Sequence, residues 1–152
     1  MEAERSVFPL GGTPTVLVAD DDRDHCLALA KIFARAGYRV RTAADGQEAL
    51  NALREQPIDL VLTDLRMPRM NGLDLLLNIR ALRPQIAVII VTAFGEWTTY
   101  MQAMDCGCAD YLNKPVRRGD ILLTARKALA RRGIRAPDVP ARRPEDPAEP
   151  AA

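Results

Sequence analysis

Short apolar runs alternate along this chain with longer segments of helical periodicity, and this alternation constrains the fold more than any other feature. The runs typical of strands are Thr15–Ala19, Tyr38–Ala43, Ile58–Thr63, Ile86–Thr92 and Asp110–Leu112. Successive strand–helix units of this length pack as a parallel sheet with right-handed crossovers and with helices on both faces. The sequence therefore predicts an α/β fold with a doubly wound, five-stranded parallel sheet.

Helix signals fall between the predicted strands. Asp22 or Asp24 is placed to cap a first helix, and Gly37 is placed to stop it. The segment Asp45–Glu48 has the pattern of a capping box that opens a second helix. Further helices are expected from Asn71 to Arg83, over Glu96–Cys106 and from about Gly119.

The composition changes near both ends of the chain. Residues 1–13 form a short segment with a proline and two glycines, which we interpret as a flexible leader. The strand–helix pattern occupies residues 14–132, which we interpret as one domain. Proline, alanine and charged residues predominate over residues 133–152, and such a composition cannot form a core. We expect a disordered tail or a linker there.

The net charge and the cysteines limit the function classes. A formal net charge of +1 over 152 residues argues against a protein that coats nucleic acid or an anionic membrane. The longest apolar stretch, Ile86–Phe94, is too short to span a bilayer. Cys26, Cys106 and Cys108 are an odd number and lack the spacing of a disulfide scaffold. We therefore expect a cytoplasmic protein with no membrane partner and no direct nucleic-acid partner.

Polar side chains stand where the predicted strands end. Asp20 and Asp21 follow the first apolar run, Asp64 follows the third, Thr92 ends the fourth and Lys114 follows the fifth. The carboxyl ends of parallel strands meet at one edge of a sheet, and α/β proteins bind their ligands there. We expect these five residues to form one site.

Three carboxylates at one site need positive partners. Two unit charges about 4 Å apart repel by roughly 4 kcal/mol at an effective dielectric near 20. Lys114 offers one positive charge against three negative ones, and a divalent cation would balance the remaining two. Carboxylate oxygens favour Mg²⁺, whereas Zn²⁺ prefers histidine and cysteine, which these strand-end motifs lack. A carboxylate beside Mg²⁺ and an ammonium is a competent nucleophile towards phosphorus.

The motifs around these residues resemble one known family. The chain resembles the receiver domain of two-component response regulators, the CheY-like superfamily, over about Thr15–Ala130. The resemblance rests on Val18–Asp22, Thr63–Pro68, Asn71–Gly72, Val91–Ala93 and Asp110–Pro115. It implies a flavodoxin-like receiver fold with the strand order 2-1-3-4-5.

The resemblance also implies a role for each site residue. Asp64 would accept a phosphoryl group with the help of Lys114 and Thr92, and Thr92 and Tyr111 would form the switch pair. The implied Mg²⁺ ligands are Asp20, Asp21, Asp64 and the backbone carbonyl of Arg66. Phosphorylation would then change the face made by the fourth helix, the fifth strand and the fifth helix.

Two features depart from the usual pattern of this family. Many relatives have smaller residues at two positions of the fourth helix, so the predicted output face is unusually bulky. It consists of Trp97, Tyr100, Met101 and Tyr111. Arg66, two residues after the acceptor, and Phe94, two residues after the threonine, flank the path of the attacking water. We expect these two side chains to slow self-dephosphorylation.

The resemblance implies a phosphorylation-activated response regulator rather than an enzyme that turns over external substrates. Its partner would be a sensor histidine kinase or a phosphotransfer protein, with the downstream partner open and a homodimer on phosphorylation as one outcome. One alternative is the receiver portion of a larger transcriptional regulator whose effector domain is missing. Another is a scaffold receiver that is not phosphorylated.

Other function classes have weaker support. A phosphatase of the haloacid dehalogenase type would need a second acid two residues after the nucleophile, where this chain has Arg66. Nucleic-acid binding through the arginine-rich end of the fifth helix lacks a recognisable reading motif. We predict that His25, close behind the acidic cluster, is an exposed histidine without a catalytic role.

Overall fold

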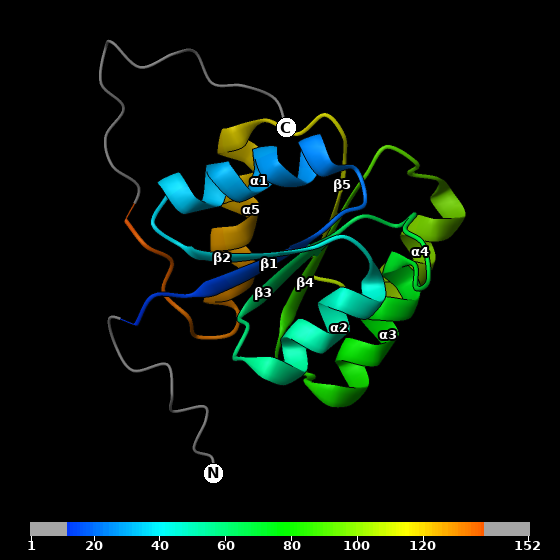
Figure 1. Ribbon diagram of the computed structural model, residues 1–152, viewed down its shortest axis with the longest axis horizontal. Helices are drawn as coiled ribbons and strands as arrows, with labels where there is room; N and C mark the ends of the chain where they lie inside the picture. Colours follow the sequence, from blue (N-terminus) through cyan, green and yellow to red (C-terminus); the bar gives the residue numbers. More distant parts are fainter. Residues whose placement is uncertain (1–11, 139–152) are drawn as a thin grey trace.

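A parallel five-stranded sheet forms the centre of the molecule (Figure 1). The computed structural model describes residues 12–138. The strands are β1 (Thr15–Ala19), β2 (Arg39–Ala43), β3 (Leu60–Thr63), β4 (Ala87–Thr92) and β5 (Asp110–Asn113). Their order in the sheet is β2-β1-β3-β4-β5, which confirms the predicted fold class and strand order.

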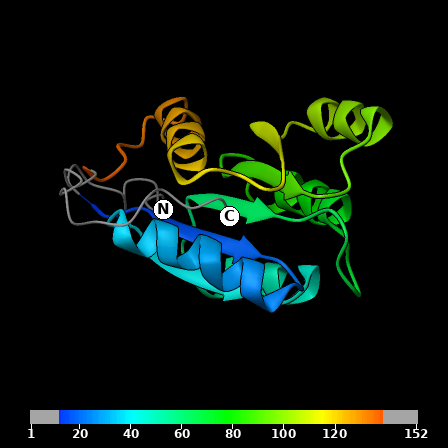
Figure 2. The same cartoon turned by 90° about the horizontal axis from the view of Figure 1, so that it is seen from above.

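Helices cover both faces of the sheet (Figures 1 and 2). They are α1 (Arg23–Arg35), α2 (Gly46–Glu55), α3 (Gly72–Leu82), α4 (Trp97–Asp105) and α5 (Arg118–Ala130). One apolar core joins α1 and α5 to one face of the sheet, and a second core joins α2 and α3 to the opposite face. Of α4, only Ala103 is buried, so most of this helix stands at the rim of the molecule.

The predicted helix caps are confirmed. Asp22, Asp45 and Asn71 cap α1, α2 and α3, because each side chain accepts a hydrogen bond from the backbone N–H three residues further on. Gly37 ends the first helical segment with a φ of 97°, a left-handed conformation that glycine adopts without steric cost. These local signals set where each helix begins and where each loop at the site lies.

The register of the sheet aligns the ends of the strands. Ala19 of β1 pairs with Thr63 of β3, so the residues that follow them, Asp20 and Asp64, leave the sheet at the same level. The last residues of β4 and β5 are also paired with each other. The strand ends therefore bring the predicted site residues to one edge.

The chain continues to pack against the domain after α5. Ala136 is buried, and Ile134 packs against the core of α1 and α5. The guanidinium of Arg126 donates a hydrogen bond to the carbonyl of Pro137 at 3.2 Å. We expected no core contacts from residue 133 onwards, whereas the described part of this segment contributes to the core. The predicted domain end at residue 132 stays a prediction.

The remaining parts of the predicted leader and tail, residues 1–11 and 139–152, lie outside the described residues. Within residues 12–138, no helix has the length and apolar character needed to cross a membrane.

Candidate functional site

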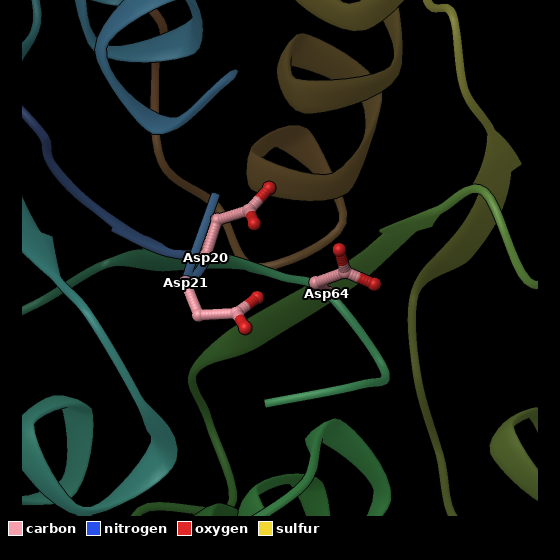
Figure 3. Close-up of side chains that lie close together, drawn as sticks. All are labelled: Asp20, Asp21 and Asp64. Atoms are coloured by element: carbon pink, nitrogen blue, oxygen red, sulfur yellow. The ribbon is translucent and has the colours of Figure 1, made fainter. Parts of the chain in front are cut away.

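Three carboxylates gather at the carboxyl ends of β1 and β3 (Figure 3). They belong to Asp20, Asp21 and Asp64, and one oxygen of each lies within 4.8 Å of the others. Asp20 and Asp64 are buried, whereas Asp21 is exposed. The cluster therefore combines two acids held inside the protein with one that is open to solvent.

Lys114 bridges the two buried acids. Its Nζ lies 2.8 Å from Asp20 Oδ2 and 2.8 Å from Asp64 Oδ2. Burial alone would lower the pKa of Lys114, but the hydrogen bonds and charges of the two carboxylates outweigh it and hold the pKa above its usual value. The ammonium therefore stays charged at neutral pH. The Lys114–Pro115 peptide bond is cis.

Asp20 accepts hydrogen bonds from three donors. Its Oδ1 accepts from the backbone N–H of Asp22 at 2.9 Å, and its Oδ2 accepts from both Lys114 Nζ and His25 Nδ1 at 2.8 Å. Burial would raise the pKa of Asp20, but the hydrogen bonds from His25, Lys114 and Asp22 together hold it below its usual value. Asp20 is therefore ionised at neutral pH although it is almost inaccessible to water.

The prediction that His25 is exposed was wrong. Its side chain is 13% exposed, and the ring is held against Asp20. His25 lies in the first turn of α1, where side chains point back towards the helix N-terminus and so towards the end of β1. The sequence does carry a signal for this contact, because it places a histidine about one helical turn behind an acidic strand end.

Asp64 is held by the backbone that follows it. Its Oδ1 accepts from the N–H of Leu65 at 2.6 Å, while its Oδ2 faces Lys114. Gly72, at the start of α3, packs directly on this segment: a Cβ there would overlap the carbonyl oxygen of Asp64 and lie 3.0 Å from Leu65 Cα. The Asn71–Gly72 pair was expected only as part of a motif, and its spacing from Asp64 gave no sign of this close approach.

An open pocket of about 600 Å³ lies beside the carboxylates, between the loops that follow β3 and β4. Its lining includes Asp21, Arg66 and Phe94, and the Arg66 guanidinium carbon lies 4.2 Å from the centre of the Phe94 ring. The buried Thr92 accepts a hydrogen bond at Oγ1 from the backbone N–H of Phe94 at 3.1 Å. The Arg66–Phe94 pair thus lines this pocket together with Asp21, the exposed acid of the cluster.

Ring contacts join the three aromatic residues of the predicted output face. The Tyr111 hydroxyl lies 3.0 Å from Thr99 Oγ1 on α4, and its ring meets Tyr100 edge-on with centroids 5.4 Å apart. Tyr100 stacks on Trp97 at 5.5 Å, and Trp97 is 72% exposed. Met101 is also exposed. Trp97 therefore packs on its neighbour without being buried by it.

The donor set fits a magnesium ion. Three carboxylates against one ammonium leave two negative charges, and each acid offers a hard oxygen donor. Asp21 is exposed, so the site keeps room for the water ligands that Mg²⁺ retains. An acidic triad of this kind is typical of the Mg²⁺ site of receiver domains.

Comparisons with known proteins identify the family. The model of the response regulator receiver domain matches residues 16–126. The transcriptional regulatory protein ZraR of Escherichia coli (strain K12) is 44% identical over 115 residues, which are 76% of this chain and 26% of ZraR. The response regulator protein PilR of Pseudomonas aeruginosa is 36% identical over 124 residues, which are 82% of this chain and 28% of PilR. The chain thus spans about a quarter of the length of these relatives.

Solved structures of receiver domains have the same fold. The receiver domain protein (CheY-like) from Methanospirillum hungatei JF-1 superposes with a TM-score of 0.77 at 28% identity, covering 80% of this chain and 97% of that one. The receiver domain of NtrX from Brucella abortus gives a TM-score of 0.72 at 32% identity, with 76% and 98% covered. The chain therefore belongs to the family of response regulator receiver domains, which are signalling domains rather than conventional enzymes.

Proposed function

We propose that the domain is a magnesium-dependent switch that accepts a phosphoryl group on Asp64 from a sensor histidine kinase or a phosphotransfer protein. One observation carries this proposal: the Asp64 carboxylate lies beside two further acids and 2.8 Å from the Lys114 ammonium. A buried carboxylate in that setting is oriented by its hydrogen bonds and lies next to compensating positive charge. The free cysteines and the proposed kinase partner are consistent with a cytoplasmic location.

The proposed reaction is a transfer from phosphohistidine to aspartate. An Asp64 carboxylate oxygen forms a bond to phosphorus while the phosphorus–nitrogen bond of the donor breaks. The departing nitrogen keeps the bonding pair, and the donor leaves as neutral imidazole because its other ring nitrogen carries the proton. Lys114 moves from neutralising two carboxylates to neutralising the new phosphoryl oxygens.

Magnesium would be held by Asp20, Asp21, Asp64 and the backbone carbonyl of Arg66. When bound, it would supply positive charge next to the phosphoryl oxygens. The residues of the chain then have separate tasks. Asp20 and Asp21 would hold the cation, and Lys114 orients the acceptor. Thr92, which now accepts from the Phe94 amide, would turn its hydroxyl towards a phosphoryl oxygen.

The proposed output is a change on the face of α4, β5 and α5. If Thr92 moves inwards, Tyr111 follows, and its contacts with Thr99 and Tyr100 must change. The face consists of Trp97, Tyr100, Met101 and Tyr111. Such a change is a shift between two populations, biased by the roughly −1.5 to −2 units of charge that phosphorylation adds. The partner on this face, including a second copy of the domain, stays open.

We further propose that the domain works as the receiver portion of a larger regulator. ZraR is a transcriptional regulatory protein, and this chain spans about a quarter of its length. The proline-rich residues 133–152 would then act as a linker to an effector domain. A scaffold receiver that is never phosphorylated is disfavoured, because the acids and Lys114 are already in bonding positions.

Arg66 and Phe94 are proposed to set the lifetime of the phosphorylated state. Their stacked side chains line the pocket together with Asp21, so they would restrict the path of an attacking water that enters there. Arg66→Asn or Phe94→Glu would open this path and shorten the lifetime. An unchanged rate of phosphoryl loss in both variants would rule out this role.

The proposed function is tested by incubating the protein with MgCl₂ and a small acyl phosphate and measuring the intact mass. We expect one added phosphoryl group, absent in Asp64→Asn and in a sample with chelator. An adduct that persists in Asp64→Asn would place the acceptor elsewhere. A folded wild-type protein that does not bind Mg²⁺ would contradict the proposed site.

A further inference from the structure

His25 has no role in the proposed function, but it contacts Asp20, which does. Nδ1 of His25 is 2.8 Å from Asp20 Oδ2, the same oxygen that accepts from Lys114 Nζ at 2.8 Å. An ionised carboxylate has no hydrogen to donate, so Nδ1 must carry the proton of this bond. Asp20 thus has a donor from α1 in addition to the one from the end of β5.

The backbone aims the ring at this contact. Asp22 caps α1 by accepting a hydrogen bond from the His25 N–H at 3.1 Å, which fixes the first turn of the helix next to the end of β1. Among the described residues, Nε2 of His25 is buried and has no partner. A buried nitrogen without a partner costs free energy, so a favourable contact must offset that cost. The bond from Nδ1 to Asp20 is the contact available to do so.

We propose that His25 is a positioning residue of the phosphoryl site, which holds the Asp20 carboxylate in the orientation that faces Lys114 and the cation. This inference rests on the proposed function. Carboxylates that bind metals are themselves commonly oriented by hydrogen bonds, and loss of such a bond typically costs 10–100-fold in metal affinity. His25 does not touch the cation or the phosphoryl group and acts only through Asp20.

Two consequences separate this role from ordinary packing. Without the Nδ1 donor, Asp20 keeps Lys114 and the Asp22 amide but can rotate more freely, so the cation site is less preorganised. Magnesium affinity then falls, whereas phosphorylation at saturating magnesium recovers because Asp64 and Lys114 are untouched. A residue that only filled space would change the stability of the fold without this selective loss.

The test is a titration of the full chain with MgCl₂, followed by calorimetry and by backbone amide NMR shifts. The variants are His25→Leu, His25→Asn and His25→Gln, with Lys31→Ala on the exposed side of α1 as the control. Asparagine carries an N–H at the distance of Nδ1 from the backbone, whereas glutamine carries it one atom further out. We expect about tenfold weaker Mg²⁺ binding in the leucine and glutamine variants and near wild-type binding in the asparagine variant.

Thermal unfolding without magnesium shows which variants are folded. If His25→Leu does not fold, the asparagine and glutamine variants decide the question, since both are polar and of similar size to the ring. Equal Mg²⁺ affinity in wild type, His25→Asn and His25→Gln would overturn the role of His25. An equal loss of Mg²⁺ affinity in His25→Asn and His25→Gln would also overturn it. Failure of the wild type itself to bind Mg²⁺ would instead contradict the proposed function, so the two failures are distinguishable.

Discussion

Two buried aspartates stand at opposite ends of the sheet and have opposite surroundings. Asp20, 3% exposed, follows β1 at the carboxyl end, and Asp59, 2% exposed, precedes β3 at the amino end. Asp20 accepts from three donors, one of them a charged ammonium. Asp59 accepts at Oδ2 from the Thr15 N–H at 2.8 Å, and its Oδ1 has no partner among residues 12–138.

Equal burial therefore gives opposite changes in pKa. Burial raises the pKa of Asp59, and the single hydrogen bond from Thr15 does not offset it. Burial would also raise the pKa of Asp20, but its three donors outweigh this effect and lower the pKa. Burial alone therefore does not decide the direction of the pKa change in these two acids; the number and charge of their donors do. Asp59 connects β1 to β3, whereas Asp20 is kept ionised in the acidic cluster where we propose that a cation binds.

The largest expected difference between the two acids is in phosphorylation. We expect Asp20→Asn to slow Mg²⁺-dependent phosphorylation by about 10–100-fold, because it removes a charge from the cation site. Asp59→Asn keeps an oxygen for the Thr15 N–H and lies at the far end of the sheet, so its rate should match the wild type. The measurement is the initial rate of mass gain with a small acyl phosphate and MgCl₂.

Equal rates for the two variants would break the comparison, because they would show that the position of the acid in the sheet does not matter. Thermal unfolding of both variants serves as the control that the fold is retained.

The sequence was sufficient for the fold and for the part of the site that lies at strand ends. A parallel sheet brings its carboxyl ends to one edge, so Asp20, Asp64 and Lys114 could be grouped from their positions after apolar runs. Cap residues such as Asp22 were also predictable, because capping is a local interaction within three residues.

The sequence was not sufficient for contacts that depend on how two elements approach each other. His25 meets Asp20 because of the angle at which α1 leaves β1, and Gly72 meets the Asp64 carbonyl because α3 starts against that loop. Ala136 is buried because the chain after α5 turns back onto the domain, although the composition around it suggested a tail. Residue spacing can bring two side chains near each other, as it does for His25 and Asp20, but it does not set how closely the two elements approach.

The second prediction compares one glycine at each end of the sheet. Gly72→Ala should lower the free energy of unfolding by about 1–3 kcal/mol, because the new methyl group overlaps the Asp64 backbone and the core cannot yield freely. Gly133, with a φ of 75°, has no neighbour within 4 Å of an added Cβ, so Gly133→Ala should cost only about 1 kcal/mol of backbone strain. Urea unfolding measures the free energy of unfolding of both variants.

Only Gly72→Ala should also slow phosphorylation, since it displaces the acceptor segment. A larger stability loss at Gly133 than at Gly72 would contradict the tight packing inferred for the carboxyl end.

The third prediction concerns the segment after α5, residues 133–138, which packs back onto the domain. A protein that ends at residue 138 should be as stable as the full chain, whereas one that ends at residue 132 should lose about 1–2 kcal/mol through exposure of Ile134 and Ala136. Phosphorylation of both should be unchanged, because this segment lies away from the acids. Equal stability of the two shortened chains would support the predicted domain end at 132.

The last prediction concerns the pH dependence of stability. It tests the comparison between Asp20 and Asp59 most directly. The lowered pKa of Asp20 means that its ionised form stabilises the fold above the usual pKa of 3.8 and that this stability is lost as the pH falls through the lowered value. The raised pKa of Asp59 means the reverse: its charge destabilises the fold at neutral pH, and the penalty disappears as the pH falls through the raised value towards 3.8.

Urea unfolding of wild type, Asp20→Asn and Asp59→Asn between about pH 7 and 3, with chelator to remove bound cations, therefore gives two curves of opposite slope. As the pH falls, the stability of wild type relative to Asp20→Asn should decrease, and that relative to Asp59→Asn should increase. The signs of the two effects follow from the directions of the pKa changes and do not depend on their size. Slopes of the same sign would show that burial governs both carboxyls, and the distinction between a structural and a functional acid would then have to rest on phosphorylation alone.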